Sequence, residues 1–352
     1  MKKYILIIFA LTLSLNSWCE TLEKQAAKLL IVGMKGTSLN DDNPVICDVA
    51  ERGVSGVIFF EHNIESKEKF KALISDLQAL REDKILMCID QEGGRVNRMK
   101  EKYGFPTMLS AESVSHSDTL ARENAQTIAS ELKQIGINLN FAPCLDVNIN
   151  PQSPAIGAMG RSFSNDENIV SQLAEIYIKE HHKQGILTSL KHFPGHGSAL
   201  KDSHLGFTDI TLSWAERELE PYKYLIDKKL CDMVMVSHLF NEKFDKNHPA
   251  TLSSAMIDSL LRKELGFKGV VISDDMQMKA ITSHYTFEKA IIRALNAGVD
   301  LFIISSNIAE TDYSVSERFI NTIVSAVETG EISKKTLNKA VNRVEKLLNR
   351  IE

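Results

Sequence analysis

Short apolar runs rich in β-branched residues recur along this chain of 352 residues, and helix-like segments separate several of them. Runs that are apolar throughout, without alternating polar residues, are typical of parallel strands whose two faces are both covered. Eight such runs occur, at residues 29–33, 56–60, 85–90, 138–147, 186–192, 233–238, 269–274 and 301–305. Helices are expected at 66–81, 119–135, 165–184 and 213–229, with a closing helix from 333 to 352.

Eight strand–helix units in about 320 residues predict an α/β fold, a (β/α)8 barrel of the TIM type. A doubly wound open sheet is the alternative. We find no linker, low-complexity tract or composition shift after residue 20, so a single domain is expected.

Ionisable side chains stand at the carboxyl ends of five of the predicted strands. In a barrel these ends meet at one mouth, which is the active-site face. A single aspartate in such a place is often a helix cap, but five positions together favour a functional site. The residues are Asp90, Asp146, Lys191 with His192, His238, and Asp274.

The segment from Lys191 to Gly197, followed by Asp202-Ser203-His204, is dense in titratable groups and broken by glycine and proline. It is therefore expected to be a loop, where side chains can be aimed at a substrate. The spacing of Asp202 and His204 lets a carboxylate orient an imidazole and tune it as a general acid or base.

Two further segments offer functional groups. In the segment 90–98, two glycines follow a strand and two arginines offer planar donors suited to carboxylates or sugar hydroxyls; pairing of Arg95 or Arg98 with Glu92 is the structural alternative. Asp274 and Asp275 are adjacent on a strand, so only one is expected to face the barrel mouth. Either could instead cap the next helix.

The composition excludes several classes of function. A net charge of −5 gives no basic excess for nucleic acid. His192 and His196 have the spacing of helical zinc ligands, but Pro194 and Gly195 lie between them, and His181-His182 is expected on a surface helix without further ligands. Neither a metal nor a cofactor is expected. The cysteines match neither a disulfide scaffold nor a zinc site, and Cys88 and Cys144 are expected to be buried.

The first 19 residues have the layout of a secretory signal peptide. Two lysines precede an apolar run at 4–15, and small residues flank Trp18 before Glu20. An uncleaved anchor is the alternative, but the run is short for a membrane span. Export to the periplasm or the exterior is therefore expected, with no stable membrane insertion after signal removal.

Taken together, the segments 191–197, 202–204, 90–96, Gly160-Arg161-Ser162-Phe163 and 273–276 resemble those of glycoside hydrolase family 3, in its single-domain, NagZ-like β-N-acetylhexosaminidase branch. The resemblance covers residues 25 to 345, with the motifs in order. It implies a (β/α)8 catalytic domain over residues 20–352 that removes terminal β-linked N-acetylglucosamine with retention of configuration.

The resemblance also implies roles for individual residues. Asp274 would be the nucleophile and His204, paired with Asp202, the acid/base. The sugar-binding residues implied in the same way are Asp90, Arg98, Arg161, Lys191, His192 and His238. The loop before Arg161 is longer than in the shortest members of the family, which affects where Arg161 is placed.

Other functions remain open from the sequence. A histidine acid/base leaves room for phosphate as the attacking group, so a β-N-acetylglucosaminide phosphorylase is one alternative. A secreted sugar-binding protein without catalysis and a metal-dependent barrel hydrolase are two more. The expected partner is a carbohydrate, either a peptidoglycan fragment or a chitin-type oligosaccharide, and the expected state is a monomer.

Overall fold

The computed structural model describes residues 20–203, 205–306 and 315–351, and these form a closed barrel of eight parallel strands. Around the barrel the strands follow the order β1-β10-β9-β7-β5-β4-β3-β2, with every neighbouring pair parallel. The barrel strands are β1 (Leu30–Gly33), β2 (Gly56–Phe59), β3 (Leu86–Ile89), β4 (Leu139–Asn140), β5 (Leu187–Phe193), β7 (Met233–Val236), β9 (Val270–Asp275) and β10 (Leu301–Ile304). The predicted barrel is confirmed, and the open sheet is excluded.

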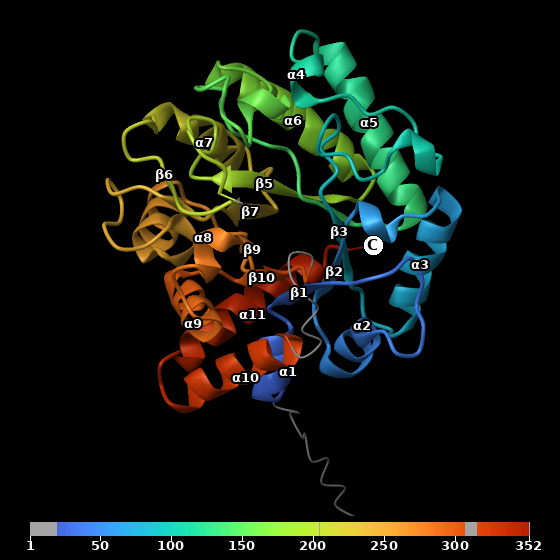
Figure 1. The fold of residues 1–352 in the computed structure, drawn as a ribbon, viewed down its shortest axis with the longest axis vertical. Coiled ribbons are helices and arrows are strands. Elements are labelled where there is room, and N and C mark those ends of the chain that lie inside the picture. The colour runs from blue at the N-terminus through green and yellow to red at the C-terminus, as the bar shows by residue number, and fades with distance from the viewer. Residues whose placement is uncertain (1–19, 204, 307–314, 352) are drawn as a thin grey trace, which may run out of the picture.

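Helices surround the strands and cover the outer face of the barrel (Figure 1). Two very short strands, β6 (Thr208–Asp209) and β8 (Leu239–Phe240), pair outside the barrel. The α-helices are α1 (Leu22–Ala27), α2 (Pro44–Cys47), α3 (Lys67–Ala79), α4 (Ala111–Val114), α5 (Asp118–Ile135), α6 (Glu167–Lys183), α7 (Glu220–Asp227), α8 (Lys279–Thr282), α9 (Phe287–Ala297), α10 (Val315–Glu328) and α11 (Lys334–Leu348).

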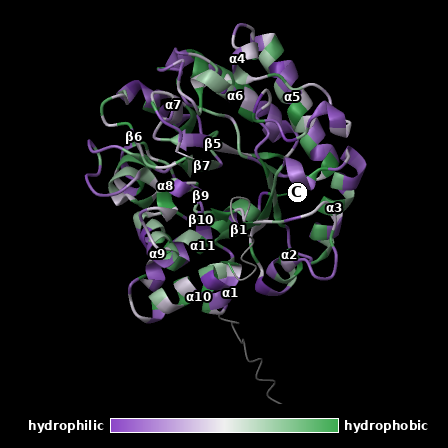
Figure 2. Cartoon of the chain, viewed as in Figure 1, coloured by the Kyte–Doolittle hydropathy of each residue, from purple (hydrophilic) through white to green (hydrophobic). Residues whose placement is uncertain are grey.

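The strands are apolar because both of their faces are buried, one inside the barrel and one beneath the helices. All residues of β2, β3, β7 and β10 are buried. Figure 2 shows green along several of the barrel strands, whereas many helices are green on one side and purple on the other. The core is therefore continuous from the barrel interior to the inner faces of the helices.

Polar side chains start several helices at the predicted places. The hydroxyl of Ser66 accepts the N–H of Lys69 at the start of α3, and the Asp166 carboxylate accepts that of Asn168 at the start of α6. Such caps satisfy N–H groups that have no partner within the helix. Gly136 ends α5 with a φ of 92°, a conformation that other residues rarely adopt.

Three sequence predictions need correction. The strand expected over 138–147 is only Leu139–Asn140 in the barrel, since Pro143 has no N–H for the ladder, and the pairing with β5 resumes only as an isolated bridge between Cys144 and Lys191. The helix expected over 213–229 begins as a 3-10 turn at Glu216, with α7 following. His181, expected on a surface, is fully buried and contacts Asn140. Cys88 and Cys144 are buried, as predicted.

None of the helices in the described ranges combines the length and apolarity needed to cross a bilayer. Residues 1–19, which carry the predicted signal peptide, lie outside the described residues.

One stability prediction follows from the barrel end opposite the mouth. Asp300, just before β10, accepts bonds from Arg262 (2.5 Å), Arg343 (2.8 Å) and the Val271 N–H (2.9 Å), and it is 1% exposed. Asp300→Ala leaves the buried Arg262 without its carboxylate, so we expect a loss of about 3–5 kcal/mol in the free energy of unfolding by urea.

Asp258→Ala is the matched control. It removes an ion pair with Lys263 whose two side chains are largely exposed, and it is expected to change the free energy of unfolding by about 0–1 kcal/mol. Equal losses for the two variants would contradict the prediction.

Candidate active site

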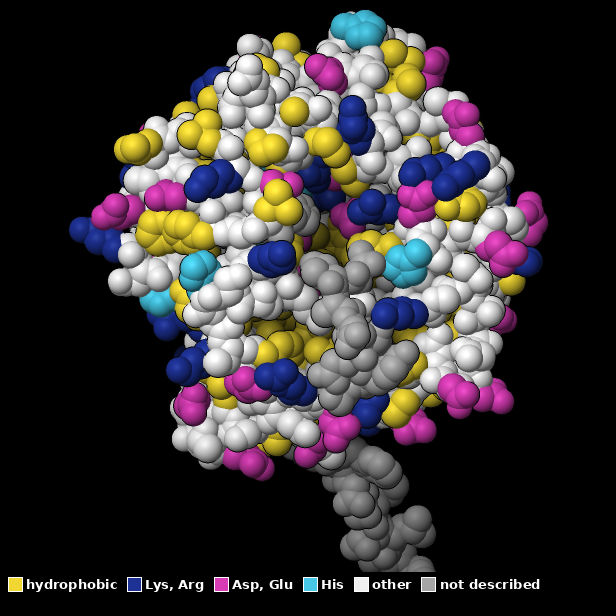
Figure 3. All heavy atoms as spheres, viewed as in Figure 1, with side chains coloured by type: hydrophobic (Ala, Val, Ile, Leu, Met, Phe, Trp, Pro, Cys, Tyr) yellow, Lys and Arg dark blue, Asp and Glu magenta, His cyan; other side chains and the backbone are white. Residues whose placement is uncertain are grey.

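A cavity of about 770 Å³ opens at the carboxyl ends of the barrel strands. Figure 3 shows the hollow near the centre of this face, with Lys and Arg side chains bordering it. Eight of the nine site residues predicted from the sequence are described, and seven of these line the cavity. Those seven are Asp90, Arg98, Arg161, Lys191, His192, Asp202 and Asp274.

Lys191 and Arg161 converge on one buried carboxylate, that of Glu92. The Lys191 Nζ lies 2.6 Å from Glu92 Oε1 and 2.7 Å from Asp90 Oδ1. Arg161 makes a two-pronged contact with Glu92, through Nε (2.9 Å) and a terminal nitrogen (2.8 Å). Bidentate contacts of this kind fix both the position and the plane of a guanidinium.

The charges in this cluster hold one another in the ionised state. Burial acts to raise the pKa of Glu92, but Arg161 and Lys191 outweigh it and hold that pKa well below its usual range. Burial acts to lower the pKa of Lys191, yet Asp90 and Glu92 raise it overall. Lys191 is therefore a fixed cation at the edge of the cavity, although its side chain is only 2% exposed.

The sequence interpretation that paired Glu92 with Arg95 or Arg98 is wrong. Arg95 is exposed, and Arg98 approaches Asp90 instead, at 3.9 Å. Arg161 reaches Glu92 from a segment 69 residues later, a distance along the chain at which the sequence offers no pairing signal. Because Arg161 is anchored in this way, the longer loop before it does not remove it from the cavity.

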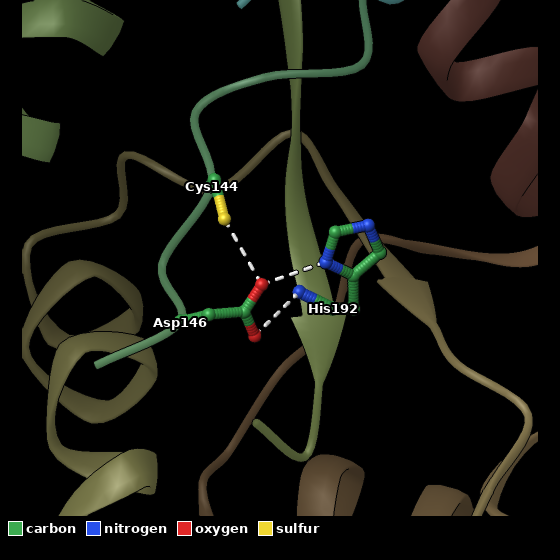
Figure 4. A group of neighbouring side chains, drawn as sticks. All are labelled: Cys144, Asp146 and His192. Carbon is green, nitrogen blue, oxygen red and sulfur yellow. Dashed lines mark hydrogen bonds and ion pairs between the residues drawn. The ribbon is translucent and has the colours of Figure 1, made fainter. Parts of the chain in front are cut away.

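His192 is held by Asp146, a residue that lies behind the cavity wall. One oxygen of the Asp146 carboxylate accepts from His192 Nδ1 (2.7 Å) and the Cys144 thiol (2.9 Å), and the other accepts from the backbone N–H of His192 (3.2 Å) (Figure 4). That second oxygen also accepts from the backbone N–H of His196 (2.7 Å). Burial alone would raise the pKa of Asp146, but interaction with His192 outweighs it and holds the pKa well below its usual range.

The second ring nitrogen of His192 indicates its tautomer. Nε2 lies 3.2 Å from a terminal nitrogen of Arg161, and a guanidinium can only donate. Nε2 therefore accepts, and the proton sits on Nδ1, facing Asp146. His192 presents a fixed, oriented ring to the cavity.

Cys144, Asp146 and His192 also offer three potential metal-ligand atoms within 4.8 Å of one another. A bound zinc would lie about 2.0–2.3 Å from each ligand atom, with tetrahedral angles between them. That geometry keeps the ligand atoms more than about 3 Å from one another. The cysteine sulfur and the imidazole nitrogen lie closer to the shared Asp146 oxygen, at 2.9 and 2.7 Å, which are hydrogen-bond lengths. The group fits a hydrogen-bond network better than a metal centre.

Asp274 and Asp275 end β9, and both contribute to the cavity wall. The expectation that only one faces the mouth is wrong, because the pairing of β9 with β10 shifts register between Ile272 and Asp275, and such an irregularity disturbs the alternation of side chains along a strand. Asp275 accepts from the Ser305 hydroxyl and from the Gln277 N–H (3.0 Å), so it also shapes the following turn. Burial raises the pKa of Asp275 to about 6.

The segment after β5 carries Asp202 to the cavity. Its first part is tied to the segment after β4: a Cβ on Gly197 would lie 1.8 Å from the Val147 carbonyl oxygen, and the Gly197 oxygen accepts from Asn150 N–H at 3.0 Å. Only glycine fits this approach. His204, the predicted acid/base, lies outside the described residues.

His238 does not line the cavity. It is 1% exposed, with Nδ1 2.8 Å from the Thr251 hydroxyl and Nε2 2.9 Å from the Asp275 carbonyl oxygen. In this structure it supports the end of β9 and does not border the space where a ligand would lie.

Sequence reasoning missed Glu92 as a member of the site, and it placed Asp146 at a strand end without giving it a role in the site. Both are fully or nearly buried carboxylates that act through the cations and the imidazole they hold. Asp146 follows an apolar run, which indicates that it lies at the end of a strand, but the sequence does not show that it binds His192.

We predict that Glu92→Gln disturbs stability in a pH-dependent way. Glu92 has a depressed pKa in the folded protein, so its contribution to stability is present above its ordinary value of 4.5 and is lost as pH falls below it. The variant should be less stable at pH 7, because two buried cations lose their carboxylate, and its stability should fall less steeply below pH 4.5. Urea unfolding from pH 3 to 7 measures both, and parallel pH profiles for variant and wild type would contradict the assignment.

Comparison with known proteins agrees with this geometry. The model of the glycosyl hydrolase family 3 N terminal domain matches residues 21–347. A beta-hexosaminidase of Nitrosomonas eutropha is 30% identical over 331 residues, which is 90% of this chain and 91% of that protein. Beta-hexosaminidase A of Pseudoalteromonas piscicida is 30% identical over 327 residues, or 86% of this chain, but the match spans only about half (54%) of that longer relative.

Among solved structures, a glycoside hydrolase family 3 beta-N-acetylglucosaminidase from Paenibacillus sp. str. FPU-7 superposes with a TM-score of 0.85 at 32% identity, covering 94% of this chain and 62% of that one. The M tuberculosis protein LpqI superposes with a TM-score of 0.80 at 27% identity, covering 93% and 94%. From the family match and these identities, the chain belongs to glycosyl hydrolase family 3.

Proposed function

We propose that this protein is an exo-acting, retaining β-N-acetylhexosaminidase that removes terminal β-linked N-acetylglucosamine through a covalent glycosyl-enzyme on Asp274. Membership of the family, with beta-hexosaminidases among its relatives, makes the chain a glycoside hydrolase with β-N-acetylhexosaminidase activity. The mechanism, the residue roles and the natural substrate are the proposed part.

The observation that carries the mechanism is the shared cavity. Asp274, at the end of a rigid strand, borders the same space as Lys191, Asp90, Arg98 and His192. Charged, fixed side chains of this kind suit a sugar, whose hydroxyls both donate and accept. A sugar ring held by them would lie within reach of a carboxylate whose position the strand determines.

In this proposal Asp274 attacks the anomeric carbon as the leaving group departs, passing through an oxocarbenium-like transition state. His204, oriented by Asp202, donates a proton to the leaving oxygen and then accepts one from water, which hydrolyses the intermediate. The placement of Asp202 at the cavity wall supports the acid/base role of its segment. An acid/base on a loop can enter after the sugar binds and exclude water.

A phosphorylase on the same site is the second candidate. Its supporting observation is the cationic cavity rim, with Lys191 and Arg161 among the lining residues, because an incoming phosphate dianion needs compensating charge. Hydrolysis remains favoured because two carboxylates, those of Glu92 and Asp90, already balance these two cations.

We also propose that residues 1–19 direct export, which would place the enzyme with peptidoglycan fragments or chitin-type oligosaccharides outside the cytoplasm. When the full chain is expressed in a bacterium, the mature protein should begin at Glu20. Mass spectrometry of the amino terminus after cell fractionation tests this, and an intact Met1 on the exported protein would point to an uncleaved anchor.

The catalytic assignments predict a clear hierarchy of losses on an aryl β-N-acetylglucosaminide. Asp274→Ala should abolish turnover because no other group forms the glycosyl-enzyme. His204→Ala should lower kcat by roughly 10²–10⁴-fold, the usual scale for general acid/base catalysis. Steady-state kinetics measure both, with Asp258→Ala, a change at an exposed carboxylate, as the control expected to match wild type.

Trapping with a 2-fluoro sugar should attach the label to the peptide that contains Asp274. The same reactions run with and without phosphate separate the two candidates, since release of a sugar 1-phosphate would favour the phosphorylase. Wild-type rates in both variants, or a label elsewhere, would overturn the mechanism.

A further inference from the structure

We propose that Glu218 is a positioning residue for the active-site segment Gly195–Asp202: its neutral form holds this segment in place, and its ionised form loosens it. The inference rests on the proposed function, because this segment carries Asp202 toward the cavity. It adds a dependence of the segment on pH that comes from a residue outside the cavity.

Glu218 is buried directly beneath the segment. It stands in the 3-10 turn Glu216–Leu219 that precedes α7, and it is 0% exposed. A Cβ on Gly195 would lie 2.7 Å from the Glu218 Cβ and 2.8 Å from its Oε2, so the carboxyl group touches the backbone of the segment. No room for water remains between them.

The hydrogen bonds of this carboxyl group are incomplete. Its Oε1 accepts the Ala215 N–H at 3.3 Å, while Oε2 has no partner of good geometry in the described part of the chain. The hydroxyl of Ser198, on the segment itself and 1% exposed, also lacks such a partner. Burying two polar groups without hydrogen-bond partners costs free energy of folding. A small shift would let the Glu218 carboxyl and the Ser198 hydroxyl form a hydrogen bond with each other.

The surroundings favour the neutral form of Glu218. Burial raises the pKa of Glu218 to about 7, and the carboxylate of Asp146 acts in the same direction, whereas Ser198 and the Ala215 N–H act against it. The other titratable neighbours are Tyr222 on α7, whose buried hydroxyl has no partner among the described residues, and His196, whose pKa burial lowers to about 4. None of these supplies a cation at pH 7.

The direction of the expected pH dependence follows from the raised pKa of Glu218. The neutral carboxyl, present below pH 7, carries no charge that burial would penalise, so it can stay packed against the segment. As pH rises through about 7, the carboxylate is left beside Asp146 and against backbone, and the stabilisation is lost. Moving the segment away so that water can enter relieves that charge.

The chain contains its own probe of this movement. The indole N–H of Trp214 donates to the Pro194 carbonyl oxygen at 3.0 Å, immediately before Gly195, and the ring is 7% exposed. The sequence has two tryptophans, the other being Trp18. In the full chain carrying Trp18→Phe, tryptophan fluorescence therefore comes from Trp214 alone, which is hydrogen-bonded to the backbone at the start of the segment.

The experiment is a pH titration of that fluorescence without substrate. We expect a transition with a midpoint near pH 7 in the Trp18→Phe chain and its loss after Glu218→Gln, whose amide is neutral at every pH. Glu216→Gln, a change at an exposed carboxylate of the same turn, is the matched control and should keep the transition.

Ser198→Ala provides a second test that does not depend on the folding of the Glu218 variant. Ser198 acts to lower the pKa of Glu218, so its removal should shift the midpoint to higher pH. A flat titration in the Trp18→Phe chain, or an unchanged midpoint in Glu218→Gln, would overturn the proposal.

Kinetics connect the movement to turnover. The ratio of kcat for Glu218→Gln to that of wild type should rise by up to roughly tenfold from pH 6 to pH 8, following the ionised fraction of a group titrating near 7. The ratio cancels the titration of His204, which is common to both proteins. If the wild type shows no hydrolysis at all, the proposed function fails, while the fluorescence result still decides the role of Glu218.

Discussion

The site depends on one buried carboxylate and the two cations that surround it. Glu92 is almost without water contact, and it remains ionised because Arg161 and Lys191 lie against it. The reverse also holds, since these cations would be costly to bury without it. This arrangement turns three flexible side chains from distant parts of the chain into a fixed wall. The orientation of His192 follows in turn, because Arg161 faces one ring nitrogen and Asp146 the other.

The barrel could be predicted from the sequence because its strands are buried on both faces and therefore apolar throughout. The prediction failed in the regions where backbone chemistry overrides the pattern of apolar residues. Pro143 interrupts the ladder between β4 and β5, and the helix before residue 220 is replaced by a 3-10 turn. Because the carboxyl ends of barrel strands meet at one mouth, the sequence correctly predicted that one cavity is lined by Asp90, Lys191, His192 and Asp274.

The sequence predicts where a side chain lies in the barrel much better than it predicts which other side chain it contacts. Glu92 has arginines three and six residues away, yet it binds one 69 residues later. Likewise His238 stands at a strand end, as the cavity residues do, but its ring is turned to Thr251 and the backbone of Asp275. Such choices depend on which side chains the closed barrel brings together, and neither spacing nor composition contains that information.

The close approach of Gly197 to the Val147 carbonyl has a consequence for how this enzyme could diversify. The neighbouring stretch is closely packed at two points, against the Val147 backbone at Gly197 and against the Glu218 side chain at Gly195. A side chain larger than that of glycine at either position would require the facing loop to move. Three residues further on, Leu200 is 72% exposed, and substitutions can accumulate without that constraint. Substitutions that change substrate preference, in natural or designed variants, are therefore expected at that outer edge.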